Sequence, residues 1–479
     1  MGSRRDCTWI LGLAGFRVVT TTSDGDAVDS RLTIRIERRG VRRHRCSGCG
    51  RRTSHVRSAR DRTWDDVPWA SHPVTLIYAQ RRVRCRQCGI RTEGIEFADP
   101  KARVTRRLRQ QIGVDCQSMP TSHAAVRHGV SWGKARRAEH AFLRDWDGQR
   151  RRRRPRYLGA DEIYRGKAPK FYTVLSDLVH GEVIGLAKDR TEASLAGLLT
   201  TCLDARQRAA VDAVCTDMHR PYVNAVAHQL PNAETVFDKF HVLQHASAAL
   251  DDVRRQEFFR AGAVMRAYGR GKRWLLLRRW KTVRGSKRRE LEQLFAMNRR
   301  LFKASVLREQ LDRLWTYTTR WGVARFLLGW LNALRWQRLP EMEKLGDTLA
   351  NHLDGIAAYC DHPVRFGVVE SLNTTIKAVL RRARGMRNNA MLLLKLKWAT
   401  AHPIRSARDL ARFLSPQGLY SNRRRTGYSC TQSRTSPVTC WRTMQSSATN
   451  APSPEAIGMT ELRWLEEAVL EVPGGGGVH

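Results

Sequence analysis

The segment AAVDAVCTDMHRPYVNAV, residues 209–226, decides the fold prediction because an apolar run within it ends at a carboxylate. Residues 211–215 are apolar apart from one acid and predict a buried strand, which stops at Thr216 and Asp217. An aspartate placed directly after a buried strand can direct its charge into a cleft. The residues around this segment indicate which group Asp217 would bind.

The flanking sequence predicts the other strands of the same sheet. Residues 156–165 (RYLGADEIYR) form a strand pattern that leads to Asp161, and two further strands are joined by a turn at His180 and Gly181. An amphipathic helix precedes the strand that ends at Asp217, and a helix and a fifth strand follow it. These remaining elements are expected at residues 170–181, 182–190, 191–210, 221–230 and 233–242. A three-strand meander, a crossover helix and a strand–helix–strand unit are the element order of a ribonuclease-H-like fold.

In this element order the first and fourth strands are neighbours, so Asp161 and Asp217 are expected to meet. Two carboxylates held together at neutral pH repel each other unless a cation lies between them. Carboxylate oxygens suit Mg²⁺, which keeps some of its waters and takes phosphate oxygens as further ligands. We therefore expect these two side chains to hold a divalent metal ion.

Other acids near these strands are weaker candidates for metal ligation. Strand alternation directs Glu162 to the face opposite Asp161. Asp177 ends a strand that lies one place further out and is interpreted as a turn residue, and Asp212 lies too early in its strand.

A third carboxylate is expected from the helical pattern of residues 365–389 (RFGVVESLNTTIKAVLRRARGMRNN). Glu370 lies at the edge of the apolar stripe of this helix. Lys377, Arg381 and Arg384 continue the adjacent face as a basic strip that could follow a DNA backbone. Because most amphipathic helices carry a charged face, this pattern alone also fits a solvated surface.

Two Cys-x-x-Cys pairs mark the amino-terminal region: CSGC, with Cys46 and Cys49, and CRQC, with Cys85 and Cys88. Each pair can form half of a tetrahedral thiolate cage around Zn²⁺, and each is followed by a glycine that suits a tight knuckle. The separation of the pairs is longer than usual, and residues 72–85 alternate like a strand. These features favour a zinc ribbon with an enlarged loop over four unrelated free cysteines, and no thioredoxin-like context supports redox chemistry.

Residues 104–146 predict a helix-turn-helix. A helical stripe is followed by a short helix that breaks at Gly129, and a third helix begins at Ser131. Lys134, Arg136 and Arg137 are expected on the outer face of the third helix, which would enter the major groove of DNA. A three-helix packing module with a solvated basic face is the alternative.

The charge balance points to a polyanionic partner. The 479 residues contain 86 Lys and Arg against 45 Asp and Glu, a formal net charge of +41, and basic runs such as RRRRRPR recur. Neutralising DNA phosphates releases counterions, which favours double-stranded DNA as the partner. A GC-rich genome that favours Arg codons, or binding to an anionic membrane surface, would also explain the excess of basic residues. No apolar run reaches the roughly 18 residues of a membrane span, and residues 7–16 (CTWILGLAGF) are interpreted as a strand rather than a signal peptide because Arg17 interrupts them.

Three blocks of this sequence resemble those of the bacterial insertion-sequence transposases called the ISL-three family. They are YLGADEIYRGKAPKFYTVLSDL, CTDMHRPYVNAVAHQLPNAETVFDKFHV and GVVESLNTTIKAVLRRARG, and the resemblance covers about residues 10–414. It implies a DDE transposase that binds the terminal inverted repeats of its element and cuts and rejoins DNA.

By position, the resemblance assigns the catalytic carboxylates to Asp161, Asp217 and Glu370. They would bind two Mg²⁺ or Mn²⁺ ions about 3.5–4 Å apart. Asp238 and His241 of the block DKFHV would support the site, with a structural role favoured for His241. A ribonuclease-H-like nuclease without strand transfer and a zinc-ribbon/helix-turn-helix regulator remain the alternatives.

The expected layout is multidomain mixed α/β, with a zinc ribbon and helix-turn-helix followed by a ribonuclease-H-like core that has a large α-helical insertion. The expected ranges are 1–100 for the ribbon region, 101–149 for the helix-turn-helix, 150–156 for a basic linker, 157–414 for the core with its insertion at about 258–360, and 415–479 for a disordered or aberrant tail. Joining two element ends implies a homodimer or larger assembly on DNA. The expected location is the bacterial cytoplasm, at the nucleoid.

Overall fold

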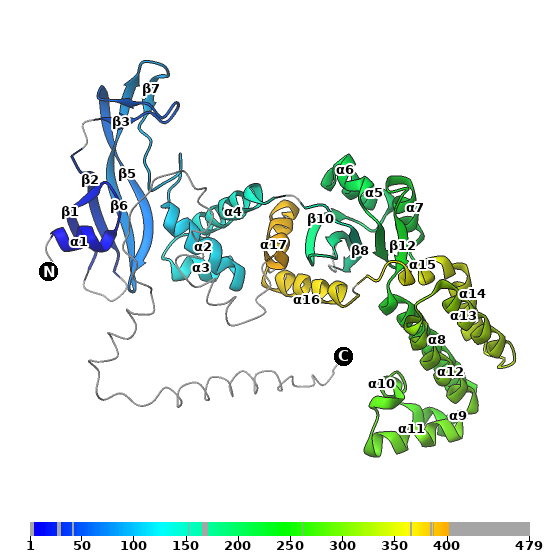
Figure 1. Ribbon diagram of the computed structural model, residues 1–479. Helices are drawn as coiled ribbons and strands as arrows, with labels where there is room; N and C mark the ends of the chain where they lie inside the picture. Colours follow the sequence, from blue (N-terminus) through cyan, green and yellow to red (C-terminus); the bar gives the residue numbers. More distant parts are fainter. Residues whose placement is uncertain are drawn as a thin grey trace, which may run out of the picture. The chain divides into compact units, whose positions relative to one another are not determined.

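The computed structural model describes residues 4–401, except 26–29, 41–42, 152, 165–170, 261, 365, 384–385 and 387 (Figure 1). The predicted tail at 415–479 and Arg384 therefore lie outside the described residues.

The amino-terminal part is built on a mostly antiparallel sheet. It contains α1 (Arg4–Leu11), β1 (Phe16–Ser23), β2 (Leu32–Arg38), β3 (His44–Arg45), β4 (Arg52–Thr53), β5 (Val56–Trp69), β6 (His72–Cys85) and β7 (Gly89–Thr92). The strand order is β1-β2-β6-β5, β7 pairs with β6, and β3 pairs with β4. The long β5–β6 hairpin lies between the two cysteine pairs and explains their wide separation.

The prediction of a strand at residues 7–16 is wrong, because Arg4–Leu11 is helical. Thr8 and Leu11 are buried while Trp9 and Ile10 are exposed. This burial follows the helical period rather than strict alternation, so Thr8 and Leu11 lie on the inner face of a short helix that covers β1.

Three helices follow, α2 (Arg106–Ser118), α3 (Thr121–Arg127) and α4 (Trp132–Gln149). Thr105 caps α2 by accepting a hydrogen bond from the backbone N–H of Leu108. Gly129 adopts a positive φ of 60° between α3 and α4, the conformation that glycine adopts without steric cost. The helix–short helix–turn–helix order agrees with the sequence prediction.

A second sheet has the strand order β10-β9-β8-β11-β12. Its strands are β8 (Tyr157–Tyr164), β9 (Phe171–Asp177), β10 (Glu182–Lys188), β11 (Ala213–Thr216) and β12 (Glu234–Phe237). β8 pairs with β9 in antiparallel and with β11 in parallel orientation. The predicted ribonuclease-H-like topology, with the first and fourth strands adjacent, is confirmed.

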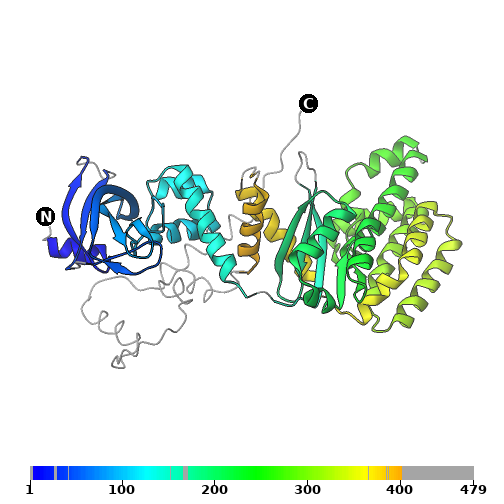
Figure 2. The same cartoon turned by 90° about the horizontal axis from the view of Figure 1, so that it is seen from above.

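Helices cover both faces of this sheet (Figures 1 and 2). One face packs on α5 (Glu192–Cys202) and α7 (Arg220–Gln229), and the short α6 (Ala205–Ala209) lies between them in sequence. The other face packs on α16 (Phe366–Arg382) and α17 (Asn389–Ala401). Leu372, Ile376 and Val379 of α16 are buried, which confirms the predicted inner face of the helix that carries Glu370.

Every element assigned among the described residues between β12 and α16 is helical. These elements are α8 (Lys239–Arg260), α9 (Gly262–Gly269), α10 (Arg273–Leu276), η1 (Trp280–Thr282), α11 (Gly285–Met297), α12 (Arg299–Gln310), η2 (Leu311–Thr316), α13 (Arg320–Arg335), α14 (Pro340–Asn351), α15 (Leu353–Ala357) and η3 (Ala358–Cys360). These helices share one hydrophobic cluster that begins at Phe237 of β12, so they form a core of their own beside the sheet.

Candidate active site and metal centre

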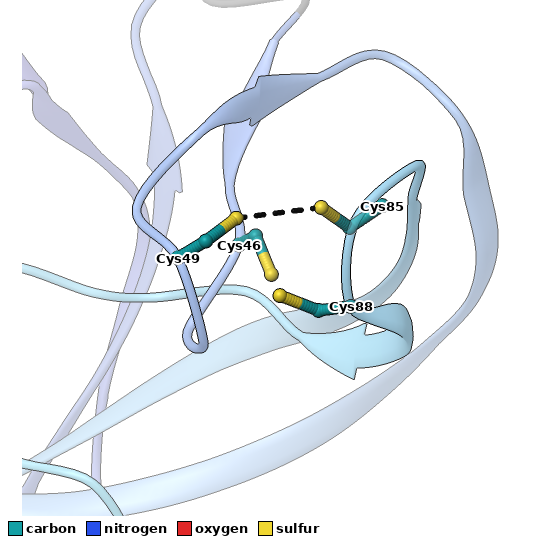
Figure 3. Close-up of side chains that lie close together, drawn as sticks. All are labelled: Cys46, Cys49, Cys85 and Cys88. Atoms are coloured by element: carbon teal, nitrogen blue, oxygen red, sulfur yellow. Dashed lines mark hydrogen bonds between the residues drawn. The ribbon is translucent and has the colours of Figure 1, made fainter.

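The sulfur atoms of Cys46, Cys49, Cys85 and Cys88 face a common centre (Figure 3). All of them lie within 4.8 Å of one another, and Cys49 Sγ is 3.5 Å from Cys85 Sγ. A tetrahedron with Zn–S bonds of about 2.3 Å requires S···S distances of about 3.8 Å. The four side chains therefore fit one Zn²⁺ ion with little movement.

The surroundings of Cys85 suit a thiolate ligand, whereas the hydrogen bond with Cys49 raises the pKa of Cys88. Hydrogen bonds from the backbone N–H groups of Cys88 and Gln87 lower the pKa of the Cys85 thiol to about 7, which favours the deprotonated form that binds metal. Gly50 and Gly89, which follow the two pairs, have φ values of 74° and 70°. These left-handed turns are the reason for glycine at both positions.

The predicted DNA-contacting cations of α4 differ in their surroundings. Arg137 is exposed, whereas Arg136 is half-buried with Nη1 4.0 Å from Met386 Sδ. Lys134 is also half-buried and forms an ion pair with Asp65 of β5. Of the three, Arg137 is thus the side chain most open to a DNA backbone.

Asp161 and Asp217 lie on neighbouring strands of the second sheet. Asp161 is in β8, and Asp217 directly follows β11. Both line one small cavity of about 10 Å³, together with Asp238, His241 and Asn373. This volume holds about one water-sized sphere, and three carboxylate side chains contribute to its lining.

Asp161 is held by two hydrogen bonds. Asn373 Nδ2 of α16 donates to Asp161 Oδ2 at 2.7 Å, and the backbone N–H of Glu162 donates to Oδ1 at 2.7 Å. Burial nevertheless raises the pKa of Asp161, and the nearby charge of Asp238 adds to this. A cation in the cavity would offset the cost of ionising this carboxylate.

Asp238 and His241 form a pair at the start of α8. His241 Nδ1 lies 3.1 Å from Asp238 Oδ2. Burial alone would lower the pKa of His241, but the hydrogen bond to Asp238 and the charges of Asp161, Asp238 and Asp217 outweigh it and raise the pKa. The charges of all three aspartates of the cavity therefore raise the pKa of the His241 imidazole.

Glu370 lies at the rim of the site and is exposed. It lines a larger adjoining cavity of about 990 Å³ with Asp161, Asp238, His241, Lys377 and Arg381. Among the described residues, the cysteine cluster is the one group of His, Cys, Asp or Glu ligand atoms that lie within 4.8 Å of one another. Glu370 thus lines the larger cavity together with Asp161 but does not line the small one. The exposed Lys377 and Arg381 also line the larger cavity.

Three family models match successive parts of the chain. A transposase model of the ISL3 family matches residues 158–396, a zinc-finger model of the IS204, IS1001, IS1096 and IS1165 transposases matches residues 42–88, and a helix-turn-helix model of transposase family ISL3 matches residues 94–142. The chain belongs to the ISL3 transposase family. The resemblance drawn from the sequence blocks is thereby confirmed.

Curated relatives agree with this assignment. The transposase for insertion sequence element IS1001 of Bordetella parapertussis is 29% identical over 365 residues, which are 74% of this chain and 88% of the relative. The transposase for IS1557 of Mycobacterium tuberculosis is 25% identical over 409 residues, which are 79% of this chain and 91% of the relative.

This transposase is therefore a DNA-processing enzyme, its helix-turn-helix and transposase regions bind DNA, and its four-cysteine cluster is a zinc site. Within the described part of the chain, no helix has both the length and the apolar character needed to cross a bilayer.

Sequence reasoning assigned no role to three side chains near Asp161 and Asp217. Glu162 was set aside as a metal ligand, and its pKa is raised by burial and by the charge of Asp217. Arg190 forms ion pairs with both of these acids. Asn373, which bonds to Asp161, lies three positions after Glu370 on α16, and this helical spacing could have identified it. No neighbouring sequence pattern predicts that Arg190 contacts Asp217.

Proposed function

We propose that this transposase cleaves and joins DNA with a DDE carboxylate set, in which Asp161, Asp217 and Glu370 bind two Mg²⁺ or Mn²⁺ ions. The observation that carries the proposal is the small cavity flanked by Asp161 and Asp217 on adjacent strands. Glu370 would complete the set from α16 across the larger cavity.

The side chains present suit these ions. The cavity offers carboxylate oxygens, the amide of Asn373 and one imidazole, and hard oxygen ligands are those that Mg²⁺ prefers. When bound, such ions activate the attacking oxygen and stabilise the leaving oxygen of an in-line displacement.

The proposed chemistry has two displacements at phosphorus. First, a water oxygen attacks the phosphodiester at the element end, the bond from phosphorus to the 3′ oxygen breaks, and that oxygen takes a proton to give a 3′ hydroxyl. This hydroxyl then loses its proton and its oxygen attacks a target phosphorus. The bond from that phosphorus to the target's 3′ oxygen breaks, and the released oxygen takes a proton. Asn373 would keep Asp161 oriented through its 2.7 Å hydrogen bond, and His241 would orient Asp238.

DNA would be held by several basic surfaces. The zinc ribbon and helix-turn-helix would recognise the terminal inverted repeats, with Arg137 on α4 reaching the duplex. Lys377 and Arg381 line the larger cavity and would contact phosphates beside the cut. Bringing two ends together would require at least a homodimer, and the enzyme would act at the bacterial nucleoid.

The proposed function assigns each step to a domain of the chain. The ribbon region would occupy 1–100, the helix-turn-helix 101–149 and the core 157–414, joined by the basic linker at 150–156.

The test is a cleavage and strand-transfer assay with the full chain and with precut and uncut element ends. Asp217→Asn should retain end binding and lose both reactions by more than about 100-fold, since ligand loss exceeds the 10–100-fold effects of residues behind the ligands. Asp212→Asn is the matched control, because Asp212 pairs with Arg156 outside the cavity. Full activity of Asp217→Asn would refute the catalytic assignment, and cleavage without joining of precut ends would indicate a nuclease.

A further inference from the structure

Arg190 places a guanidinium between two acids of the proposed active site. Its Nη2 donates a hydrogen bond to Asp217 Oδ2, and its Nε lies 3.1 Å from Glu162 Oε2. The Asp217 side chain is 9% exposed and that of Glu162 is 20% exposed. The positive charge is therefore presented to acids that are largely shielded from water, where charge interactions are screened less.

The local backbone is built to hold Arg190 in this position. β10 ends at Lys188, and Asp189 then adopts a left-handed conformation with φ 66°. Thr173 Oγ1 donates to the carbonyl oxygen of Asp189 at 2.6 Å, and Thr191 caps α5 by accepting from the backbone N–H of Ser194. A strained non-glycine residue persists only where its surroundings fix it, so the turn between β10 and α5 fixes the backbone from which the Arg190 side chain extends.

The guanidinium retains unused hydrogen-bonding capacity. Arg190 Nε and Glu162 Oε2 are both buried and, within the described part of the chain, neither atom has a hydrogen-bond partner. Their 3.1 Å approach is thus an electrostatic contact without hydrogen-bond alignment. Once released from Asp217, the planar guanidinium could take phosphate oxygens in a two-point arrangement.

We propose that Arg190 is a positioning residue that neutralises Asp217 and Glu162 before a divalent ion binds, and turns to a DNA phosphate when the ion takes over Asp217. This inference rests on the proposed function. A guanidinium and a metal ion at the same carboxylate repel each other, so metal has to displace Arg190. A phosphate oxygen gives the displaced side chain a new partner, so DNA and metal should bind cooperatively.

The experiment measures Mn²⁺ binding by the zinc-loaded full chain, by calorimetry, with and without a duplex that carries the element end. Without DNA, Arg190→Gln should bind Mn²⁺ about tenfold more tightly than the wild type, because a charge-assisted bond no longer competes for Asp217. Duplex DNA should tighten Mn²⁺ binding more for the wild type than for Arg190→Gln, in which only direct phosphate ligation of the ion remains. The cleavage rate of this variant at saturating Mn²⁺ should fall.

Two variants serve as controls. Arg206→Gln on α6 removes the same charge from an exposed position and should bind Mn²⁺ like the wild type. Arg190→Lys keeps the cation and should retain the weaker, DNA-dependent Mn²⁺ binding, which also guards against misfolding of the glutamine variant.

Unchanged or weaker Mn²⁺ binding by Arg190→Gln, with binding abolished in Asp217→Asn, would overturn the role of Arg190 and leave the metal site standing. Equal Mn²⁺ binding by the wild type and Asp217→Asn would instead overturn the proposed active site itself.

Discussion

Replacing Lys395 tests how the helix-turn-helix is fixed to the catalytic region. Lys395 of α17 forms an ion pair with Glu139 of α4, and its Nζ lies 3.3 Å from the carbonyl oxygen of Cys116. The Glu139 side chain is 0% exposed and that of Lys395 is 9% exposed. Glu139 also accepts a hydrogen bond from Thr121 Oγ1 at 2.9 Å.

Lys395→Met leaves the buried Glu139 carboxylate without its cation. Breaking a buried pair by removing one partner costs about 3–5 kcal/mol of unfolding free energy, whereas replacing both partners by apolar residues is often neutral or stabilising. Lys395→Met should therefore be strongly destabilising, and the double variant with Glu139→Leu should recover most of the loss.

The assay is urea unfolding of the full chain, followed by tryptophan fluorescence, since Trp146 and Trp398 pack edge to face at this junction with ring centroids 4.8 Å apart. Lys397→Met is the matched control on the same helix. Lys397 is 22% exposed and pairs with Asp147 at 3.3 Å, and such a pair contributes at most about 1 kcal/mol. Equal effects of the two Lys→Met variants would refute the buried contact between α4 and α17.

Three further outcomes follow from the structure. Cys85→Ser should release the zinc ion, as measured by atomic absorption, and weaken binding to the element end; unchanged zinc content would contradict the ribbon. Gly113→Ala should lower the melting temperature, because a Cβ there would lie 2.2 Å from Phe142 Cγ and overpacking costs about 1–3 kcal/mol; an unaltered melting curve would speak against this packing. Trp330→Ala should destabilise the helical region by about 3–5 kcal/mol, since Trp330 is 3% exposed and its Nε1 donates to the carbonyl oxygen of Leu307. Trp336→Ala, at 84% exposure, should stay within about 0.5 kcal/mol of the wild type in denaturant unfolding, and a larger loss would show that this face is covered.

Local patterns predicted the elements well where burial follows one period. The apolar run before Asp217, the alternation around Asp161 and the stripe beside Glu370 each predicted an element that the structure contains. The zinc ligands were predictable because two residues between cysteines suffice to bring both sulfurs to one ion. The catalytic roles of the three carboxylates stay predictions until they are tested.

Residues 7–16 show where periodicity misleads. In a short apolar segment the helical and strand patterns overlap, and packing against β1 decided for the helix. Similarly, Lys134 was expected to face DNA, but its partner Asp65 lies far away in sequence on β5. Neither the helix at Arg4–Leu11 nor the ion pair of Lys134 could be predicted from the neighbouring residues in the sequence.

The sequence by itself determined most of the strands and helices and the pairing of the thiolates, because hydrophobic period and residue spacing act over a few positions of the chain. Only the tertiary structure decided that Glu162 and Arg190 share a site with Asp217, and that Glu139 is buried against Lys395. The physical reason is that charge interactions depend on separation in space and on shielding from water. Both are set by how the sheet and its helices pack.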